Sequence, residues 1–224
     1  SLLETLRSVA GPGIPGVVAR PVLELPEVER RVDLGDEGRI RVLTISNFSY
    51  RAKSRGIDVI ADALREAAAD LGIAVRLDVL GGGIHEEEVR SRWEGVHGAL
   101  EVACHGQVAD IRPYLGSADV FAYCSTLDAY GLAILEAQAC GLPVMVNSHS
   151  DFRDFLVDGE DALFFAADSP GQVRDVAGKL LGSRELRRRI GDRGRSSAHR
   201  RNDAASVGAD LAAFLEDLQA GPAS

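Results

Sequence analysis

Short apolar runs alternate with longer stretches of mixed polarity from residue 39 to the end of the chain. The apolar runs hold three to six residues each, as buried strands do: 40–45, 75–80, 102–105, 120–123, 144–146 and 163–165. The stretches between and after them are predicted helices, most with apolar side chains at helical spacing: 56–71, 86–98, 110–115, 131–140, 170–181, 184–193 and 203–218.

This alternation is typical of an α/β fold. Strands that are apolar throughout are buried on both faces, and connections through a helix make them parallel and right-handed. We therefore predict a Rossmann-like parallel sheet with helices on both faces. Ligands of such sheets bind beyond the carboxyl ends of the strands. The loops in which to seek function are 46–55, 81–86, 105–109, 124–131 and 147–153.

The first 38 residues do not share this pattern. Glycine and proline dominate 11–16, and proline recurs at 21 and 26, which breaks any long helix or central strand. Residues 27–38 are rich in charge and end in Gly-Asp-Glu-Gly. We predict that 1–38 form a linker or amino-terminal extension, and that 39–224 form the folded domain with its carboxyl-terminal helices.

Composition narrows the class of function. The 224 residues include 34 acidic and 25 basic side chains, a net charge of −9, which disfavours a protein that binds nucleic acid with its whole surface. No apolar run approaches the roughly eighteen residues of a membrane span, and the chain begins without the basic stretch of a signal peptide. The three cysteines lie inside apolar runs, which favours reduced thiols in a cytoplasmic protein.

Several common motifs are absent from the sequence. It has no P-loop sequence, no histidine and cysteine cluster with zinc spacing and no G-x-S-x-G. Gly81-x-Gly83 is followed by Glu86, where a dinucleotide fingerprint has Gly or Ala. The three glutamates that start there would repel a pyrophosphate. P-loop hydrolysis, zinc chemistry and NAD binding are therefore disfavoured.

The loop at 124–131 carries the strongest functional signal. Strand 120–123 runs into it, and a helix opens at Gly131, where the missing side chain lets a phosphate approach the free N–H groups of the helix start. Asp128 lies in the loop and Glu136 within the helix. Two carboxylates thus flank one potential phosphate site.

This segment resembles the E-x7-E region of the GT-B glycosyltransferases of family 4, or group 1. The family pattern is S-x-x-E-G-F-G-L-x-x-L-E-A-M-A-C-G-x-P-V, and the matching residues are Ser125, Tyr130-Gly131-Leu132, Leu135-Glu136-Ala137, Ala139-Cys140-Gly141 and Pro143-Val144. The resemblance extends over roughly residues 39–200. It implies that 39–224 form the carboxyl-terminal half of a GT-B fold, which binds the nucleotide-sugar donor.

The resemblance implies a role for each carboxylate. Glu136 matches the second Glu of the family, which accepts hydrogen bonds from the nucleotide ribose. Asp128 stands where the first Glu contacts the transferred sugar, and its side chain is one methylene shorter. The amides of Gly131 and Leu132 would hold the distal phosphate, and Tyr130 beside them is a further donor-binding candidate.

A basic stretch follows the first strand. Family members have Gly-Arg after this strand and a Lys before the helix, and both cations hold the diphosphate. Here Ser46-Asn47 replaces Gly-Arg, and Arg55 matches the Lys, with Lys53 and Arg51 as rivals in the same loop. Cations here would neutralise the charge that grows on the leaving diphosphate. Arg55 joins the two carboxylates as a catalytic candidate, while Asn47 and Lys53 are donor-binding candidates; the alternative is a solvated basic loop.

Two further turns complete the implied donor site. Gly81-Gly82-Gly83 corresponds to the family's G-x-G-P turn, which leaves room at the cleft, with Gly82 at its centre. His105-Gly106-Gln107-Val108 resembles the F-x-G-x-V segment whose backbone meets the nucleotide base. Val108 is therefore a candidate for contact with the base.

The resemblance also implies a reaction and a partner. A sugar passes from a nucleotide-diphosphate donor to an acceptor hydroxyl with retained anomeric configuration, without a divalent metal or another cofactor. The acceptor binds mostly to an amino-terminal domain, and the residues before 39 are too few to form one. We therefore expect this chain to be inactive without that domain.

Alternatives stay open for the function of the domain and for the role of its arginine-rich region. A UDP-sugar 2-epimerase shares the two-domain architecture, and a non-catalytic nucleotide-sugar-binding module would fit the departures at Asn47 and Asp128. Eight arginines in the region Arg184–Arg201 form either a solvated helix face or a basic patch for peripheral contact with the inner face of the membrane.

Overall fold

The computed structural model describes residue 22, residues 24–26, residue 28, and the ranges 38–126, 131–148 and 150–220. The strands are β1 (Arg39–Ile45), β2 (Ala74–Leu80), β3 (Gly95–His97), β4 (Leu100–Gly106), β5 (Val120–Tyr123), β6 (Val144–Asn147) and β7 (Leu163–Phe165). The helices are α2 (Arg51–Leu71), α3 (Glu86–Trp93), α4 (Arg112–Ser117), α5 (Leu132–Ala139), α6 (Ser150–Arg153), α7 (Pro170–Gly182), α8 (Arg184–Arg201) and α9 (Ala204–Ala220).

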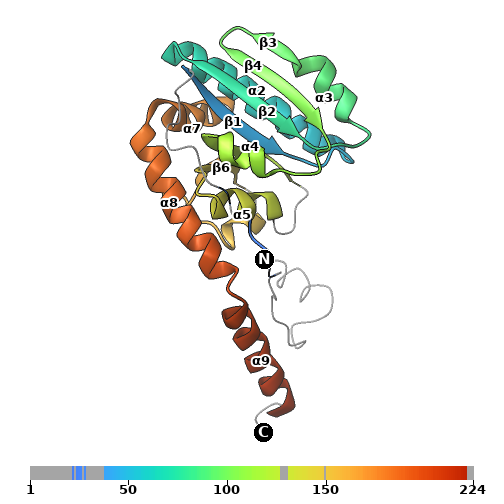
Figure 1. The fold of residues 1–224 in the computed structure, drawn as a ribbon, viewed down its shortest axis with the longest axis vertical. Helices are drawn as coiled ribbons and strands as arrows, with labels where there is room; N and C mark the ends of the chain where they lie inside the picture. Colours follow the sequence, from blue (N-terminus) through green and yellow to red (C-terminus); the bar gives the residue numbers. More distant parts are fainter. Residues whose placement is uncertain are drawn as a thin grey trace.

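The strands form one sheet in the order β3-β4-β2-β1-β5-β6-β7 (Figure 1). Every neighbouring pair is parallel except β3 and β4. From β1 the chain proceeds outwards to β2 and β4, and from β5 it proceeds the other way to β6 and β7. The carboxyl ends of β1 and β5 are therefore the switch point of the sheet, where ligands of such folds bind.

Two buried apolar clusters hold the helices against the sheet. Ile60 of α2 and Leu180 of α7 belong to the cluster on one face. Leu115 of α4 and Ile134 of α5 belong to the cluster on the other face. Helix α8 packs against α5 and α7 as an outer layer. The predicted Rossmann-like sheet with helices on both faces is confirmed.

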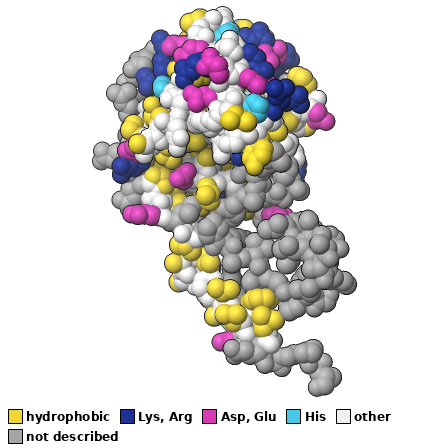
Figure 2. All heavy atoms as spheres, turned by 90° about the vertical axis from the view of Figure 1, so that its right-hand side faces the viewer, with side chains coloured by type: hydrophobic (Ala, Val, Ile, Leu, Met, Phe, Trp, Pro, Cys, Tyr) yellow, Lys and Arg dark blue, Asp and Glu magenta, His cyan; other side chains and the backbone are white. Residues whose placement is uncertain are grey.

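Part of the sheet, across β1, β2 and β4, carries charged instead of apolar side chains. Arg39 and Arg76 both pair with Glu101, at 2.6 and 3.0 Å, and Arg76 also pairs with Asp78 at 3.0 Å. We call these four residues the charged ladder, because they join β1, β2 and β4 side by side. Figure 2 shows basic and acidic side chains interleaved over the upper part of the molecule.

Helix α2 begins at Arg51, five residues before the predicted start. The predicted loop 46–55 therefore ends at residue 50, and the prediction that Arg51, Lys53 and Arg55 share a loop is wrong. Gly56, the first residue of the predicted helix, lies inside α2. A Cβ there would stand 2.1 Å from the carbonyl oxygen of Cys124, so the glycine allows close contact between α2 and the end of β5.

The predicted helix 86–98 is shorter than expected. It ends at Trp93, and residues 95–97 form β3, antiparallel to β4. Gly95 and Gly98 have φ of 114° and 69°, which allows the chain to turn on either side of this strand. The indole N–H of Trp93 donates to Asp58 of α2 at 2.8 Å and fixes the end of α3.

Helix α8 extends to Arg201, beyond the predicted end at 193. Two of its arginines point inward. Arg187 is buried and donates to the carbonyls of Leu180 and Leu181 at 2.7 and 2.9 Å. Arg201 donates to Gln138 of α5 at 2.5 Å. The others are exposed: Arg184, Arg188, Arg189, Arg193, Arg195 and Arg200.

Helix α9 projects away from the body of the molecule (Figure 1). None of its described side chains is buried, and Leu211, Leu215 and Leu218 are 40–49% exposed. Among the described residues, no helix has both the length and the apolar character needed to cross a membrane.

Candidate functional site

Three loops lie side by side at the carboxyl ends of β1, β2 and β4. The amide of Ser46 donates to the carbonyl of Leu80 at 2.9 Å, and that of Phe48 donates to the carbonyl of Gly82 at 3.1 Å. On the other side, the amide of Gly81 donates to the carbonyl of Gly106 at 2.8 Å. The strand register thus continues into the loops, which gives them a defined backbone.

The glycine turn at 81–83 is required by this close packing. Gly81 has φ of 126°, and a Cβ there would stand 1.7 Å from the carbonyl oxygen of Ser46. Gly83 has φ of 148°, and a Cβ there would stand 2.5 Å from the carbonyl carbon of Phe48. Gly82, the predicted donor-binding residue, has space for a Cβ, whose nearest neighbours would lie 3.4 Å away. The steric demand therefore falls on its two neighbours.

The start of α2 combines a helix terminus with cations. Its first turn contains no acidic residue, so the partial positive charge of the helix terminus is not offset there. Residues two apart in a helix lie about 200° apart around its axis. Lys53 and Arg55 therefore approach the helix start from different sides, and Lys53 shares the side of Ile57 and Ile60, which face the core.

The basic residues differ in exposure and pairing. Arg51 is exposed and pairs with Glu88 of α3 at 3.2 Å. Arg55 is exposed, and within the described part of the chain it forms no ion pair. Asn47 is also exposed, and its side-chain oxygen accepts the amide of Ser49 at 2.8 Å. Asn47 thus shapes the turn between β1 and α2.

The start of α5 is built around Gly131. This buried residue caps the helix with φ of 63° and ψ of 54°. The left-handed conformation favours glycine, and a Cβ at this position would also crowd the side chains of Ile134 and Phe152, at 2.9 and 3.3 Å. Leu132, the first helical residue, is 45% exposed. Asp128 and Tyr130 lie outside the described residues.

Glu136 lies one turn inside α5 and is half-buried. Burial raises the pKa of its carboxyl above the usual value. Its carboxylate receives no hydrogen bond or ion pair from any residue that the structure describes. A desolvated acceptor without a partner binds a hydroxyl donor more strongly than a carboxylate that water already satisfies.

Asn147 was not identified from the sequence, yet it fixes the entrance of the loop after β5. It is buried at the end of β6, its side-chain oxygen accepts the amide of Ser125 at 2.9 Å, and its side-chain nitrogen donates to the carbonyl of Ser125 at 2.9 Å. The signal available in the sequence is a polar residue that directly follows an apolar strand.

Val108 lies on the loop that follows β4. It is partly buried and packs against the same apolar cluster as Ile111 and Tyr114. Near it, Gly106 has φ of 67° and turns the chain out of the strand.

The structure brings the first turns of α2 close to the loop that leads into α5. Gly56 of α2 contacts Cys124, where the loop towards α5 begins. The cations of α2 and the capping glycine of α5 therefore belong to one switch point. Among the described residues, no group of three or more His, Cys, Asp or Glu side chains is arranged to hold a metal ion; metal independence stays a prediction.

Comparison with protein families finds a match over most of the folded domain. The family described as glycosyl transferases group 1 matches residues 39–183. The lipopolysaccharide core biosynthesis glycosyltransferase LpsE of Rhizobium meliloti (strain 1021) is 31% identical in an alignment of 199 positions, which covers 77% of this chain and 57% of LpsE. A D-inositol 3-phosphate glycosyltransferase of Xylanimonas cellulosilytica is 29% identical in an alignment of 152 positions, which covers 65% of this chain and 36% of that protein. The chain thus spans about a third to a little over half of these relatives.

Solved structures with a similar fold include sucrose-phosphate synthase from Thermosynechococcus elongatus. It is 18% identical with a TM-score of 0.75, and the match covers 98% of this chain and 56% of that one. HepE of Anabaena, solved in complex with UDP and glucose, is 19% identical with a TM-score of 0.65. That match covers 82% of this chain and 50% of HepE. These structures share the fold of this chain and extend well beyond it.

Proposed function

The chain belongs to the group 1 glycosyltransferases, and from this we propose that it is the donor-binding part of a retaining glycosyltransferase. Its ligand would be a nucleotide-diphosphate sugar, seated at the switch point between β1 and β5. The observation that carries this proposal is the start of α5, where a left-handed Gly131 opens the helix about one turn before Glu136. The carboxylate of Glu136 is half-buried and has no partner among the described residues.

The diphosphate would lie between the starts of α2 and α5. Lys53 and Arg55 reach the start of α2 from different sides, so together they can hold the two phosphate groups that face its free N–H groups. The amides of Gly131 and Leu132 would bind the distal phosphate from the other side. The structure of HepE in complex with UDP and glucose supports a ligand of this class.

The ribose and the sugar would occupy the two sides of α5. We assign the ribose hydroxyls to the carboxylate of Glu136, whose partial burial strengthens hydrogen bonds that it accepts. Asp128 is proposed to contact the transferred sugar, with Tyr130 beside it. Gly82 and Val108 would border the ligand on the β2 and β4 side, where the loops after these strands are tied together.

In the proposed reaction the bond between the anomeric carbon and the diphosphate oxygen breaks, and the acceptor hydroxyl oxygen forms a new bond to that carbon. The diphosphate leaves with the bonding electron pair, and the hydroxyl proton passes to it. Negative charge therefore grows on the diphosphate during the reaction. Lys53, Arg55 and the two helix starts would stabilise that charge without a metal ion.

We propose that the acceptor binds to a separate amino-terminal domain. The relatives are longer than the matched part of this chain, which leaves room in them for such a domain. The exposed apolar row of α9 and the exposed arginines of α8 are candidate contact surfaces for that domain and for an anionic membrane surface, respectively. The chain alone is then expected to bind donor without transferring sugar.

The test is a calorimetric titration of the chain with UDP, GDP, ADP, CDP and TDP in the presence of EDTA. Saturable binding of one of them, which weakens when Glu136 is replaced by Ala, supports the donor site and identifies the base. The matched control is Glu160→Ala, which removes an exposed carboxylate that lies outside the proposed site. Absence of binding to all five nucleotides contradicts the proposal.

A further inference from the structure

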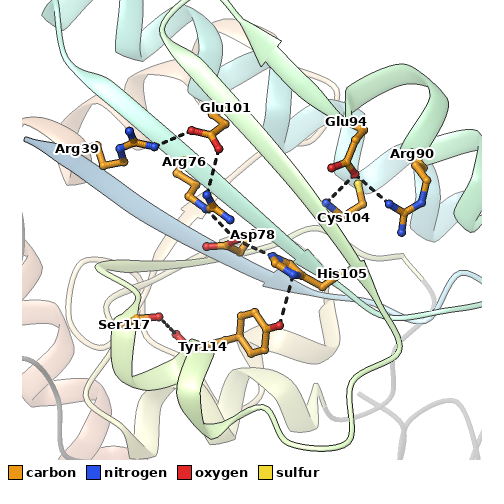
Figure 3. Close-up of polar contacts among 10 residues, drawn as sticks. All are labelled: Arg39, Arg76, Asp78, Arg90, Glu94, Glu101, Cys104, His105, Tyr114 and Ser117. Carbon is orange, nitrogen blue, oxygen red and sulfur yellow. Dashed lines mark hydrogen bonds and ion pairs between the residues drawn. The ribbon is translucent and has the colours of Figure 1, made fainter. Parts of the chain in front are cut away.

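His105 occupies an irregular position at the end of β4. Val79 pairs with Cys104 while Leu80 pairs with Gly106, so His105 is the extra residue of a bulge in β4. A bulge changes the direction in which a side chain points and ends the regular pairing. In Figure 3 the ring of His105 lies between Asp78 of β2 and Tyr114 of α4.

Both ring nitrogens of His105 are engaged. Nε2 lies 2.8 Å from Oδ1 of Asp78, and Nδ1 lies 3.3 Å from the hydroxyl oxygen of Tyr114. A carboxylate only accepts hydrogen bonds, so Nε2 donates to Asp78, and Nδ1 of the neutral ring accepts from Tyr114. The two rings also meet edge to face, with centroids 4.9 Å apart.

Asp78 is itself held firmly. It is 9% exposed. Its Oδ1, which accepts the hydrogen bond from His105, also accepts one from Nε of Arg76 at 3.0 Å. Arg76 also forms an ion pair with Glu101, which in turn pairs with Arg39 of β1. The position of His105 therefore depends on the charged ladder across three strands.

These contacts close the base of the loop that leads from β4 to α4. His105 lies near the end of β4, just before the loop, and Tyr114 lies in the first turn of α4, just after the loop. On the opposite side, the carbonyl of Gly106 accepts the amide of Gly81 at 2.8 Å. The loop is thus anchored at both ends, while Val108 in its middle packs against the same buried apolar cluster as Tyr114 and Ile111.

We propose that Asp78, His105 and Tyr114 form a clasp that positions residues 106–108 against the nucleobase of the donor. This inference rests on the proposed function, in which the loop forms the base side of the site. The three are positioning residues, because they act through the loop backbone. The diphosphate would be held elsewhere, at the starts of α2 and α5, so the clasp should affect binding of the base and spare binding of the phosphates.

The test compares UDP with inorganic pyrophosphate, the latter measured by competition against UDP. We expect Tyr114→Phe, which removes one hydrogen bond of the clasp, to weaken UDP binding by about three- to tenfold. Asp78→Asn should weaken it in the same direction. The affinity for pyrophosphate should stay within about twofold of that of the unaltered chain, because the phosphate contacts are retained.

Ser117→Ala is the matched control, since its hydroxyl donates to the carbonyl of Tyr114 at 3.2 Å on the same helix without joining the clasp. Melting curves of each variant exclude unfolding as the cause. Unchanged UDP affinity in Tyr114→Phe overturns the clasp, and so does an equal loss of UDP and pyrophosphate binding. If the unaltered chain binds neither UDP nor any of the other four nucleotides, the proposed function fails first and the clasp fails with it.

Discussion

Gly56 lies against the carbonyl oxygen of Cys124 so closely that a Cβ on Gly56 would stand 2.1 Å from it. This contact ties the second turn of α2 to the end of β5, the strand beside β1 at the switch point. Real Cβ atoms do not approach a backbone oxygen this closely, so a side chain at residue 56 must displace either the helix or the loop.

We therefore expect Gly56→Ala to lower the free energy of unfolding by about 1–3 kcal/mol. It should also weaken nucleotide binding, because the start of α2 moves. Gly178→Ala in α7 is the control, since its Cβ would lie 4.0 Å from Ala67. That variant should gain about 0.4–1 kcal/mol, because alanine restricts the unfolded chain. Denaturant unfolding measures the stability of both variants. Equal changes in the free energy of unfolding would contradict the close contact at Gly56.

The second prediction concerns the cations of α2. Lys53→Gln and Arg55→Gln should each weaken binding of the nucleoside diphosphate by about 1.5–3 kcal/mol, the contribution of a charged hydrogen bond. Arg51→Gln should have little effect, because Arg51 pairs with Glu88 on the α3 side. Calorimetry at two salt concentrations measures this. A loss of affinity in Arg51→Gln alone would place the diphosphate on the α3 side of the helix and contradict its assignment to Lys53 and Arg55.

The third prediction concerns Glu136 and pH. Burial raises the pKa of its carboxyl, so its neutral form favours folding. That contribution is fully present below the unfolded pKa and is lost as the pH rises through the raised folded pKa. Glu136→Gln should therefore stabilise the fold at neutral pH while weakening donor binding by about 1–3 kcal/mol.

The stability difference between Glu136→Gln and the unaltered chain should disappear as the pH falls below about 4.3, the usual value for Glu, because both side chains are then neutral. Thermal unfolding of both proteins between pH 4 and 8 measures this stability difference. A gap that instead widens towards low pH would contradict the desolvated environment of this carboxyl.

The fourth prediction concerns Asn147. Asn147→Ala removes two buried hydrogen bonds to the backbone of Ser125, which should lower the free energy of unfolding by about 1–3 kcal/mol for each group left unpaired. The loop towards α5 loses its anchor as well, so donor affinity should fall. Asn47→Ala, an exposed turn residue, is the comparison for stability and should change it by less than about 1 kcal/mol.

The sheet could be predicted from the sequence because its strands are short apolar runs. All six predicted strands are present within two residues of their expected ends. The start of α2 was misplaced because Gly56 resembles a helix boundary, and its actual reason, the contact with Cys124, lies between segments far apart in the chain. The edge strand β3 was missed because only its pairing with β4 favours an extended conformation in such a polar segment.

The sequence predicted the motif residues of the candidate site, but not the residues that hold its loops in place. Gly131 and Glu136 could be proposed from the sequence because they lie at a predicted helix start and match the family motif; their roles in binding stay predictions. Asn147 and the contacts of His105 were missed because they depend on which strands are neighbours, which no local pattern encodes. Asp128 and Tyr130 lie outside the described residues, so their roles stay predictions.

The contact between Gly56 and Cys124 has a consequence for experiments that need no ligand. Burial raises the pKa of the Cys124 thiol to about 12, so in the folded chain it is protected from alkylation at pH 8. We expect Cys124 to become reactive when α2 separates from β5, because Gly56 of α2 lies against it. In a chain whose other two cysteines are replaced by serine, the rate at which Cys124 is labelled therefore reports how often the switch point opens.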